Sequence, residues 1–324
     1  MTEFVERLAL GDRVGAVART RELLDEGFSR ADVRELIARA QHEVGRLWQS
    51  NTWTVAQEHI ATGISESVLL AVGTSGDAAG DRGHVLVVCA DGEWHLLPAR
   101  LLAEELDDAG FRVTFAGGSM PAEHLVGTVR QLGPDVVAVS CTLSLNLAGA
   151  ARTVAAVHAA GRPVLVGGAA FGTDQQRAAA VGADAWASDV AAATAIVERW
   201  VEEPPEREPP TRRDRAEADR LYREEARLVE DAYHRLSARF PDLSRYSEWQ
   251  VDRTREDLAY HLRYLASAAL VGDDGVYLEM LPWLRELLTS RGVGARAVDV
   301  TVEVLREVAA AESLPETQRI LARA

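Results

Sequence analysis

The sequence contains no lysine and no long apolar run, and it is short of basic charge. Every basic side chain is arginine, a bias we attribute to codon usage in a GC-rich genome, and 50 acidic residues against 35 basic ones give a net charge of −15. Such a chain is not expected to bind nucleic acid, because that binding relies on basic surface. The absence of an apolar run of about 18 residues and of a signal-peptide pattern predicts a cytoplasmic protein outside the membrane.

Cysteine is also scarce. Cys89 and Cys141 lie in apolar, strand-like runs, and neither belongs to a CxxC pair. A disulfide framework or a zinc site is therefore not expected. The 324 residues, of which 47% are hydrophobic, are enough for two or three domains with cores of their own.

The apolar pattern divides the chain into three parts. Residues 1–75 carry apolar side chains at three- and four-residue steps, which predicts a helical bundle. Residues 84–200 alternate β-branched runs with helical stretches, which predicts a Rossmann-like parallel sheet. Four prolines among charges in residues 201–214 predict a stiff linker, and residues 215–324 again have helical periodicity. The expected fold class is multidomain α and α/β, with an all-α carboxyl-terminal domain.

The loop after the first expected strand carries the clearest motif. It reads DGEWHLLP, and Glu93-Trp94-His95 within it resembles the D-x-H-x-x-G motif of cobalamin-binding Rossmann-like domains. The resemblance implies that His95 ligates cobalt from the lower face of the corrin, and that Glu93 holds the other imidazole nitrogen. This chain departs from the family twice, with Glu93 in place of Asp and Pro98 in place of Gly.

Two later loops extend the resemblance. The family has an S-x-L element whose hydroxyl meets the buried nucleotide tail of the cofactor, and Ser140-Cys141-Thr142 keeps the Ser but not the Leu. Gly167-Gly168 matches a Gly-Gly pair that lets the backbone approach the tail. An NAD-type Rossmann domain is disfavoured because no GxGxxG follows the first strand. A flavodoxin-like receiver is disfavoured because the strand-one loop lacks the acidic cluster.

The first part of the chain contains the stretch WQSNTWTVAQEH, in which nine residues separate Trp48 from the pair Glu58-His59. The same W-x9-E-H spacing occurs in the bundle of light-dependent carotenoid repressors that use adenosylcobalamin. The resemblance implies that Trp48 packs over the upper axial adenosyl group and that Glu58 accepts its hydrogen bonds. Those repressors have a His after the Trp, and this chain has Gln49. His59, His42 or water could then take the upper position after photolysis.

The carboxyl-terminal part resembles the central helices of phycobiliproteins, the globin-like bilin carriers. Asp257, Leu262-Arg263 and Val271-Gly272-Asp273 fall in register with that family, but Thr254 replaces the Cys that forms the thioether. Because this part has no cysteine, any bilin, such as biliverdin, must be held without a covalent bond.

The same resemblance assigns roles to side chains. It implies that Asp257 accepts hydrogen bonds from the pyrrole nitrogens and that Arg255 and Arg263 bind the propionates. The aromatic side chains that could wall the tetrapyrrole are Tyr260, His261, Tyr264 and Trp249.

The order of bundle, cobalamin domain and bilin-type globin resembles the photocobilins, photoreceptors that combine cobalamin with biliverdin. The resemblance covers the full chain and implies a light sensor without enzymatic activity, which signals to a partner protein or through a change in oligomer. No segment for DNA binding is identified, so direct repression of transcription is not expected. A corrinoid carrier for a methyltransferase, or a single-chromophore cobalamin sensor with an interaction module at 215–324, remain alternatives.

Overall fold

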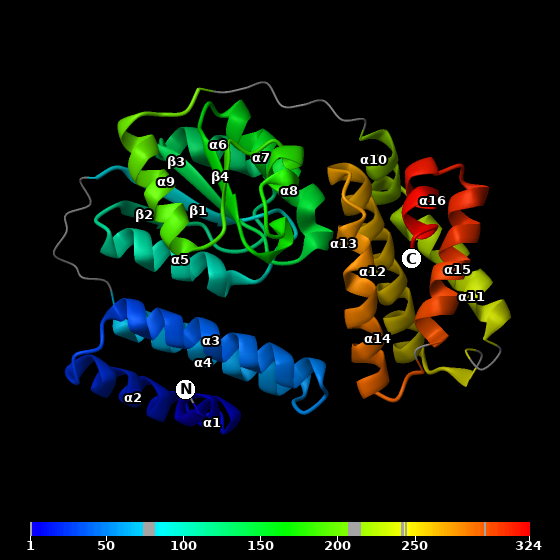
Figure 1. Ribbon diagram of the computed structural model, residues 1–324, viewed down its shortest axis with the longest axis horizontal. Coiled ribbons are helices and arrows are strands. Elements are labelled where there is room, and N and C mark those ends of the chain that lie inside the picture. The colour runs from blue at the N-terminus through cyan, green and yellow to red at the C-terminus, as the bar shows by residue number, and fades with distance from the viewer. Residues whose placement is uncertain (1, 74–81, 207–214, 241–242, 244, 295) are drawn as a thin grey trace.

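The computed structural model describes residues 2–73, 82–206, 215–240, 243, 245–294 and 296–324. Its elements form a helical bundle, an α/β unit and a second helical group (Figure 1). Residues 74–81, around the boundary between the first two predicted parts, and residues 207–214 of the predicted proline-rich linker lie outside the described residues. No helix in the described part is long and apolar enough to cross a membrane.

The bundle contains α1 (Thr2–Ala9), α2 (Arg13–Asp25), α3 (Arg30–Gln49) and α4 (Val55–Val72). α3 and α4 each begin with a capping box, in which Ser29 pairs with Asp32 and Thr54 with Gln57. Each box satisfies amide groups that the first helical turn leaves unpaired. The W-x9-E-H stretch therefore spans two helices, from the last turn of α3 to the first turn of α4.

All five predicted strands are present. They form one parallel sheet in the order β2-β1-β3-β4-β5, made of β1 (His84–Cys89), β2 (Arg112–Phe115), β3 (Val136–Ser140), β4 (Val164–Gly167) and β5 (Ala185–Ala187). Cys89 pairs with Ser140, and Ser140 with Gly167, so the carboxyl ends of β1, β3 and β4 lie level. The strand order reverses between β1 and β3, and open α/β sheets bind ligands at such a switch point.

Helices cover both faces of the sheet. One face carries α5 (Leu96–Asp108) and α9 (Val190–Glu202). The other carries α6 (Ala122–Leu132), α7 (Leu147–Ala159) and α8 (Gln176–Val181), with the short 3-10 helices η1 (Ser144–Asn146) and η2 (Ala169–Phe171) in the loops after β3 and β4. Burial on both faces explains why β1, β3 and β4 read as mostly apolar runs. The edge strand β2 is only half-buried and includes the exposed Arg112.

The second helical group contains α10 (Ala216–Arg223), α11 (Glu225–Arg239), α12 (Glu248–Val271), α13 (Gly275–Leu278), α14 (Met280–Ser290), α15 (Arg296–Ala311) and α16 (Pro315–Leu321). The stretch predicted as one helix over 215–239 is interrupted at Glu224. α12 starts with a capping box between Ser247 and Gln250, and it ends at Gly272, whose φ of +66° suits glycine.

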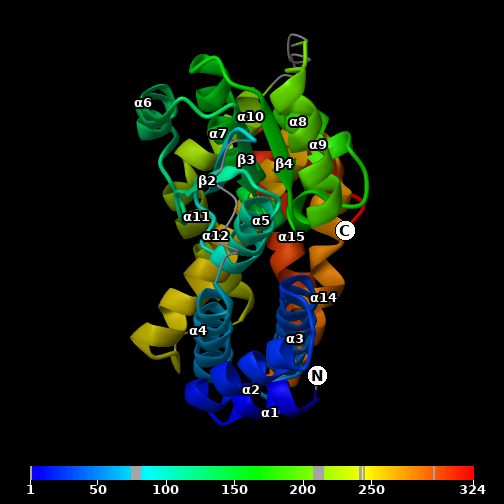
Figure 2. The same ribbon diagram turned by 90° about the vertical axis from the view of Figure 1, so that its left-hand side faces the viewer.

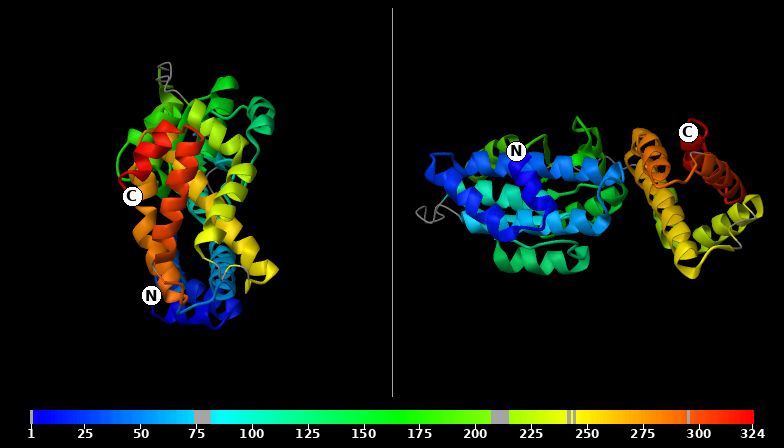
Figure 3. Two further views of the ribbon diagram at one scale, coloured as in Figure 1. Left: turned by 90° about the vertical axis from the view of Figure 1, so that its right-hand side faces the viewer. Right: turned by 90° about the horizontal axis from the view of Figure 1, so that it is seen from below.

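Apolar packing joins the three parts. Buried residues of α7 and α8 belong to the same core cluster as those of α12, α13 and α15. On the other side, Leu97 of α5 packs into the core of the bundle. Figure 2 shows the bundle below α5, and the right-hand view of Figure 3 shows the second helical group at one end of the bundle, where α14 contacts α3. The α/β unit therefore lies between two helical parts that both touch it.

Candidate functional site

The loop after β1 brings Glu93 and His95 into contact. Glu93 is fully buried, and its Oε1 accepts a hydrogen bond from Nδ1 of His95 at 2.5 Å and one from the His95 amide at 2.9 Å. Its Oε2 accepts hydrogen bonds from the amides of Thr142 and Leu143, at 2.8 and 3.0 Å, and from the Asn146 side chain at 3.2 Å. The switch-point loops after β1 and β3 are thus joined through one carboxylate.

These contacts decide the charge state of the pair. Burial alone raises the pKa of Glu93, but the hydrogen bond from His95 and those from the Leu143 and His95 amides outweigh it and lower the pKa to about 2. The hydrogen bond to Glu93 raises the pKa of His95. Nδ1 of His95 then carries the proton, so Nε2 is the nitrogen left for a ligand.

The imidazole is open on its outer side. The His95 side chain is 51% exposed, and its Nε2 has no hydrogen-bond partner within the described ranges. An imidazole oriented by a buried carboxylate, with its second nitrogen free, is the arrangement found at protein metal ligands. These residues therefore fit a metal-centred cofactor bound through Nε2.

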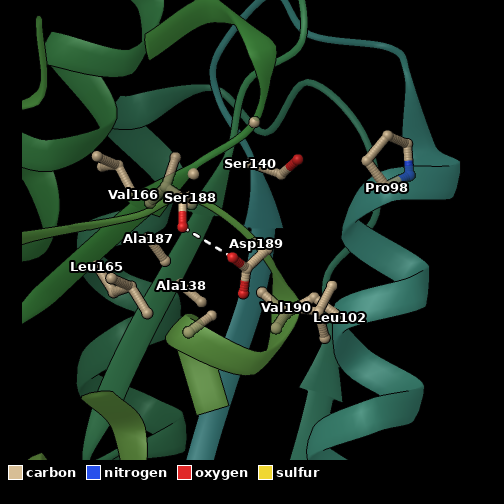
Figure 4. Close-up of a pocket in the computed structure, with 14 residues that line it drawn as sticks. Pro98, Leu102, Ala138, Ser140, Leu165, Val166, Ala187, Ser188, Asp189 and Val190 are labelled. Atoms are coloured by element: carbon tan, nitrogen blue, oxygen red, sulfur yellow. Dashed lines mark hydrogen bonds between the residues drawn. The ribbon is translucent and has the colours of Figure 1, made fainter. Parts of the chain in front are cut away.

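A cavity of about 160 Å³ opens at the carboxyl ends of β3, β4 and β5 (Figure 4). Its walls are mostly apolar and include Leu102, Leu165 and Val190, and Ser140 adds a hydroxyl. Gly167 and Gly168 also line it. Ser188 and Asp189 add further polar atoms. The cavity therefore suits a ligand that presents an apolar ring and a few hydrogen-bonding groups.

The structure gives Gly168 a role in the fold itself, besides the predicted approach to a ligand. Gly168 has a φ of +104°, and a Cβ atom built there would lie 2.3 Å from the carbonyl oxygen of Cys141. At Gly167 the nearest atom to such a Cβ is the Ala187 oxygen at 3.3 Å. The loop after β4 therefore passes so close to the loop after β3 that position 168 requires glycine even without a ligand.

We expect Gly168→Ala to destabilise the protein by about 2–4 kcal/mol, because it combines an unfavourable φ with a backbone clash. The matched control is Gly127→Ala in α6, where a Cβ meets no atom within 4 Å, so that the helix is expected to gain up to about 1 kcal/mol. Urea unfolding measures both. Equal stability of the two variants would contradict the role of Gly168.

Thr142 contributes its backbone rather than its hydroxyl to the pair. Its amide donates to Glu93, whereas its Oγ1 is buried and has no hydrogen-bond partner among the described residues. Buried hydroxyls are normally paired. The unpaired Oγ1 beside the Glu93 loop is a second feature that fits a missing ligand.

In the bundle, Trp48 faces the second helical group. Its ring lies 6.2 Å from the ring of Trp283 in α14, at an angle of 35°, and the Arg291 guanidinium lies 5.0 Å from the ring centre. Arg291 also donates to the Trp48 carbonyl at 3.2 Å. The residue predicted to cover the cofactor is therefore held by a different part of the chain.

Gln49 takes part in the same contact. Its side chain donates to Glu286 at 2.9 Å, and its carbonyl accepts a hydrogen bond from Ser290 at 3.1 Å. Gln49, which stands where the repressors have a His, thus forms hydrogen bonds that link α3 to α14.

Glu58 and His59 follow in the first turn of α4. Glu58 accepts hydrogen bonds from Nδ1 of His59 and from the Thr62 hydroxyl, and His59 is 75% exposed. After the Glu93 contacts, the charge of Glu58 is a further influence that raises the pKa of His95. The structure therefore brings Glu58 of the bundle and His95 of the α/β unit within electrostatic reach of each other.

One face of α12 carries four of the predicted bilin contacts. The helical spacing places Trp249, Asp257, Tyr260 and Tyr264 on one side. Trp249 and Tyr260 are 69% and 46% exposed, and Asp257 is also exposed. Within the described part of the chain nothing donates a hydrogen bond to Asp257. Although the residue as a whole is exposed, desolvation of the carboxyl by the surrounding protein, followed by the charge of Glu256, raises its pKa to about 6.

Three other predicted contacts lie elsewhere. Arg255 is paired with Glu230 at 2.7 and 3.0 Å, and Arg263 with Glu225 at 2.7 Å through two nitrogens. His261 is buried, and its Nδ1 lies 2.9 Å from the Tyr277 hydroxyl. Burial lowers the pKa of His261 to about 4, so it is a neutral core side chain.

These placements bear on three of the expected contacts. Arg255 and Arg263 each hold a carboxylate through a two-nitrogen contact, so a propionate would compete with Glu230 and Glu225 for them. His261 does not line the exposed face of α12. Helical phase explains the two arginines, because Arg255 and Arg263 lie two and six residues from Asp257 and so point to other sides of α12. His261 lies one turn after Asp257 but is buried against Tyr277.

Sequence patterns missed several residues of the site. Leu143 and Asn146 donate to Glu93, and a Cβ on Gly149 would lie 1.7 Å from the Asp91 carbonyl oxygen, so that only glycine lets α7 approach the β1 loop. The one available signal was position, because all three follow β3 and so lie at the switch point. The residue types of these three positions do not form a motif.

Comparison with known proteins supports the assignment of parts. Two models described as B12 binding domains match residues 1–72 and 83–195, and a model described as a phycobilisome protein matches residues 211–323. The chain is 33% identical over 144 residues to the HTH-type transcriptional repressor CarH of Myxococcus xanthus, covering 44% of this chain and 48% of CarH. It is 35% identical over 86 residues to CarA of the same organism, covering 26% and 30%.

The chain thus spans about half the length of CarH and less than a third of CarA. Among solved structures, the monomethylamine corrinoid protein of Methanosarcina barkeri superposes with a TM-score of 0.53 at 17% identity, over 61% of this chain and 96% of that one. This likeness shows the fold alone. The chain accordingly combines B12 binding domains, similar to part of the CarH repressor, with a phycobilisome-like domain.

Proposed function

We propose that this protein is a photoreceptor with two chromophores, adenosylcobalamin and non-covalently held biliverdin. Its signal is a rearrangement of the bundle against the α/β unit, driven by light. The observation that carries the cobalamin part is the Glu93–His95 pair, which leaves Nε2 of His95 open at the switch point beside an apolar cavity. The match to CarH, named a repressor, supports a regulatory role over an enzymatic one.

Each residue then has a role. His95 binds cobalt through Nε2, Glu93 keeps the proton on Nδ1, and Ser140 with the glycines at 167 and 168 receives the nucleotide tail. When bound, adenosylcobalamin supplies a cobalt–carbon bond that light can break. Trp48 and Glu58 cover the upper side of this site.

The bundle is held in place by contacts that a movement would break. Arg34 of α3, only 8% exposed, pairs with Asp108 at 2.7 Å and with Glu105 of α5. At its other end, α3 is tied to α14 through Trp48 and Gln49. A change in what Trp48 and Glu58 contact is therefore passed to both neighbouring parts of the chain.

The bilin part rests on Asp257. A carboxyl without a hydrogen-bond donor, on a helix face with three aromatic side chains, is suited to accept hydrogen bonds from pyrrole N–H groups. The sequence match to a phycobilisome protein covers the same helices. Since Arg255 and Arg263 are already paired, the propionates are expected to point to solvent or to other donors.

Asp257→Asn is expected to weaken biliverdin binding roughly 10- to 100-fold, because hydrogen bonds to a charged group contribute about 1.5–3 kcal/mol. Titration of the red absorbance band with biliverdin measures the effect. Asp252→Asn, an exposed carboxyl on the same helix, serves as the control and is expected to bind as the unchanged protein does. Equal affinities of the two variants would remove Asp257 from the site.

The corrinoid carrier is the main alternative, because the fold of a corrinoid protein is shared over 61% of this chain. A carrier has to open the upper face of its cofactor to partner enzymes. Here α3 is tied to both α5 and α14, and the phycobilisome-like helices have no function in such a carrier. These contacts favour the photoreceptor.

The proposal is tested by expressing the chain with adenosylcobalamin and biliverdin, purifying it in the dark and recording absorbance before and after illumination. We expect a cobalamin spectrum with a red bilin band, and loss of the adenosyl signature in light. Preferential binding of methylcobalamin, when it is supplied together with adenosylcobalamin in the dark, would indicate a carrier. Retention of cobalamin without bilin would leave a sensor with one chromophore.

A further inference from the structure

The second helical group also holds the loop beneath His95. The Tyr222 hydroxyl in α10 and the Ser267 hydroxyl in α12 each donate to the Leu145 carbonyl oxygen, both at 3.0 Å. Leu145 is 8% exposed and Ser267 fully buried. Both lone pairs of one buried carbonyl are therefore taken by side chains that lie 77 and 122 residues further along the chain.

Leu145 lies among the residues that hold Glu93. The Leu143 amide precedes it and the Asn146 side chain follows it, and both donate to Oε2 of Glu93, at 3.0 and 3.2 Å. The other oxygen of the same carboxylate holds Nδ1 of His95 at 2.5 Å. A continuous path of short contacts thus runs from α10 and α12, through η1 and Glu93, to the imidazole.

The helices that hold the Leu145 carbonyl are themselves packed on the α/β unit. α12 shares a buried core with α7 and α8, and Arg177 of α8, which is 6% exposed, pairs with Asp273 beyond the end of α12 at 2.7 Å. The helices that grip Leu145 are therefore fixed against the α/β unit. Without their two hydroxyls, a buried carbonyl would lose its partners and η1 would be free to shift.

We propose that Tyr222 and Ser267 are positioning residues for His95, so that the phycobilisome-like part orients the lower ligand of the cobalamin site. The inference rests on the proposed binding of cobalt by His95. It gives the second helical group a role in cobalamin binding that is independent of any bilin. By reciprocity, binding at His95 also stabilises the docking of α10 and α12 on η1.

The test compares the full chain with the double variant Tyr222→Phe/Ser267→Ala, which removes two hydroxyls and keeps the packing. The control, Tyr246→Phe/Ser237→Ala, removes the same groups from α11 and the loop after it, away from η1. Each protein is labelled with ¹⁵N-histidine and loaded with cob(II)alamin. Its EPR spectrum reports whether a histidine nitrogen is the axial ligand, and a titration gives the affinity.

We expect the unchanged protein and the control to show the splitting of one axial ¹⁵N nucleus. The double variant should lose most of this splitting and bind cob(II)alamin about tenfold more weakly, as is common when a residue behind a metal ligand is removed. The single variants, each keeping one donor, should lie between, and circular dichroism of the unloaded proteins checks folding.

Two results would overturn the inference, and they differ. If the double variant keeps the full splitting and binds cob(II)alamin within about twofold of the control, the hydrogen bonds to the Leu145 carbonyl do not position His95. The proposed cobalamin function then stands. If the unchanged protein itself shows no histidine splitting, the proposed ligation by His95 fails and this inference fails with it.

Discussion

His95→Ala is expected to weaken cobalamin binding by more than about 100-fold. Residues that only support a metal ligand contribute about 10- to 100-fold to metal affinity, so removal of the ligand itself should cost more. The effect should be seen with hydroxocobalamin in the dark, by equilibrium titration of the cobalamin absorbance. The loss of His95 also removes one hydrogen-bond partner of the buried Glu93, so circular dichroism and urea unfolding of the unloaded variant check that it is folded.

His124→Ala is the matched control, since His124 is an exposed histidine at the start of α6 in the same α/β unit. It should bind cobalamin as the unchanged protein does. Imidazole added to the His95→Ala protein should restore part of the binding, because the space for the ring is retained. Undiminished binding by His95→Ala would mean that the cofactor is held elsewhere or without a protein ligand.

Glu93→Gln is expected to destabilise the protein by about 3 kcal/mol at pH 7. The pKa of Glu93 is lowered from its ordinary value of 4.5 to about 2 in the folded protein, and each pKa unit corresponds to about 1.4 kcal/mol. Glu93 is fully buried, so solvent does not screen its contacts. The glutamine keeps the shape of the side chain but removes the charge that the surrounding donors favour.

The sign of the pH dependence follows from the lowered pKa. A carboxylate favoured in the folded state contributes stability above its unfolded pKa, and this contribution is lost as the pH falls through the folded pKa of about 2. The difference between the unchanged protein and Glu93→Gln should therefore fall to less than half by about pH 3. Denaturant unfolding at several pH values measures it. A constant difference from pH 7 to 3 would contradict the low pKa, and Glu123→Gln, an exposed residue of α6, is the control.

The sheet, and the contact between Glu93 and His95, could be predicted from the sequence for a local reason. β1, β3 and β4 are mostly apolar runs buried on both faces, and the residues that follow parallel strands lie at one edge of the sheet. Glu93 and His95 sit on one such loop, two residues apart, so a short motif was enough to pair them.

The contacts between parts of the chain could not be predicted in this way. Trp48 meets Trp283, and Leu145 meets Ser267, across more than a hundred residues with no shared pattern. Whether Arg255 already has a partner depends on Glu230, which lies in another helix, α11, and belongs to no motif of α12. Family resemblance predicted which residues bind a chromophore. The face of the helix on which each residue lies, and the neighbouring helices, determine which of these residues already have a partner.

The proposed movement of the bundle is tested most directly by hydrogen–deuterium exchange of the protein loaded with adenosylcobalamin, before and after illumination. We expect faster exchange after light in residues 46–54 and 283–293, where α3 meets α14, and little change in α12 where it packs on α7 and α8. Protein without adenosylcobalamin, illuminated in the same way, should show no change. If absorbance proves that the cobalt–carbon bond has been cleaved and these segments still exchange as they did in the dark, the proposed movement of the bundle is wrong.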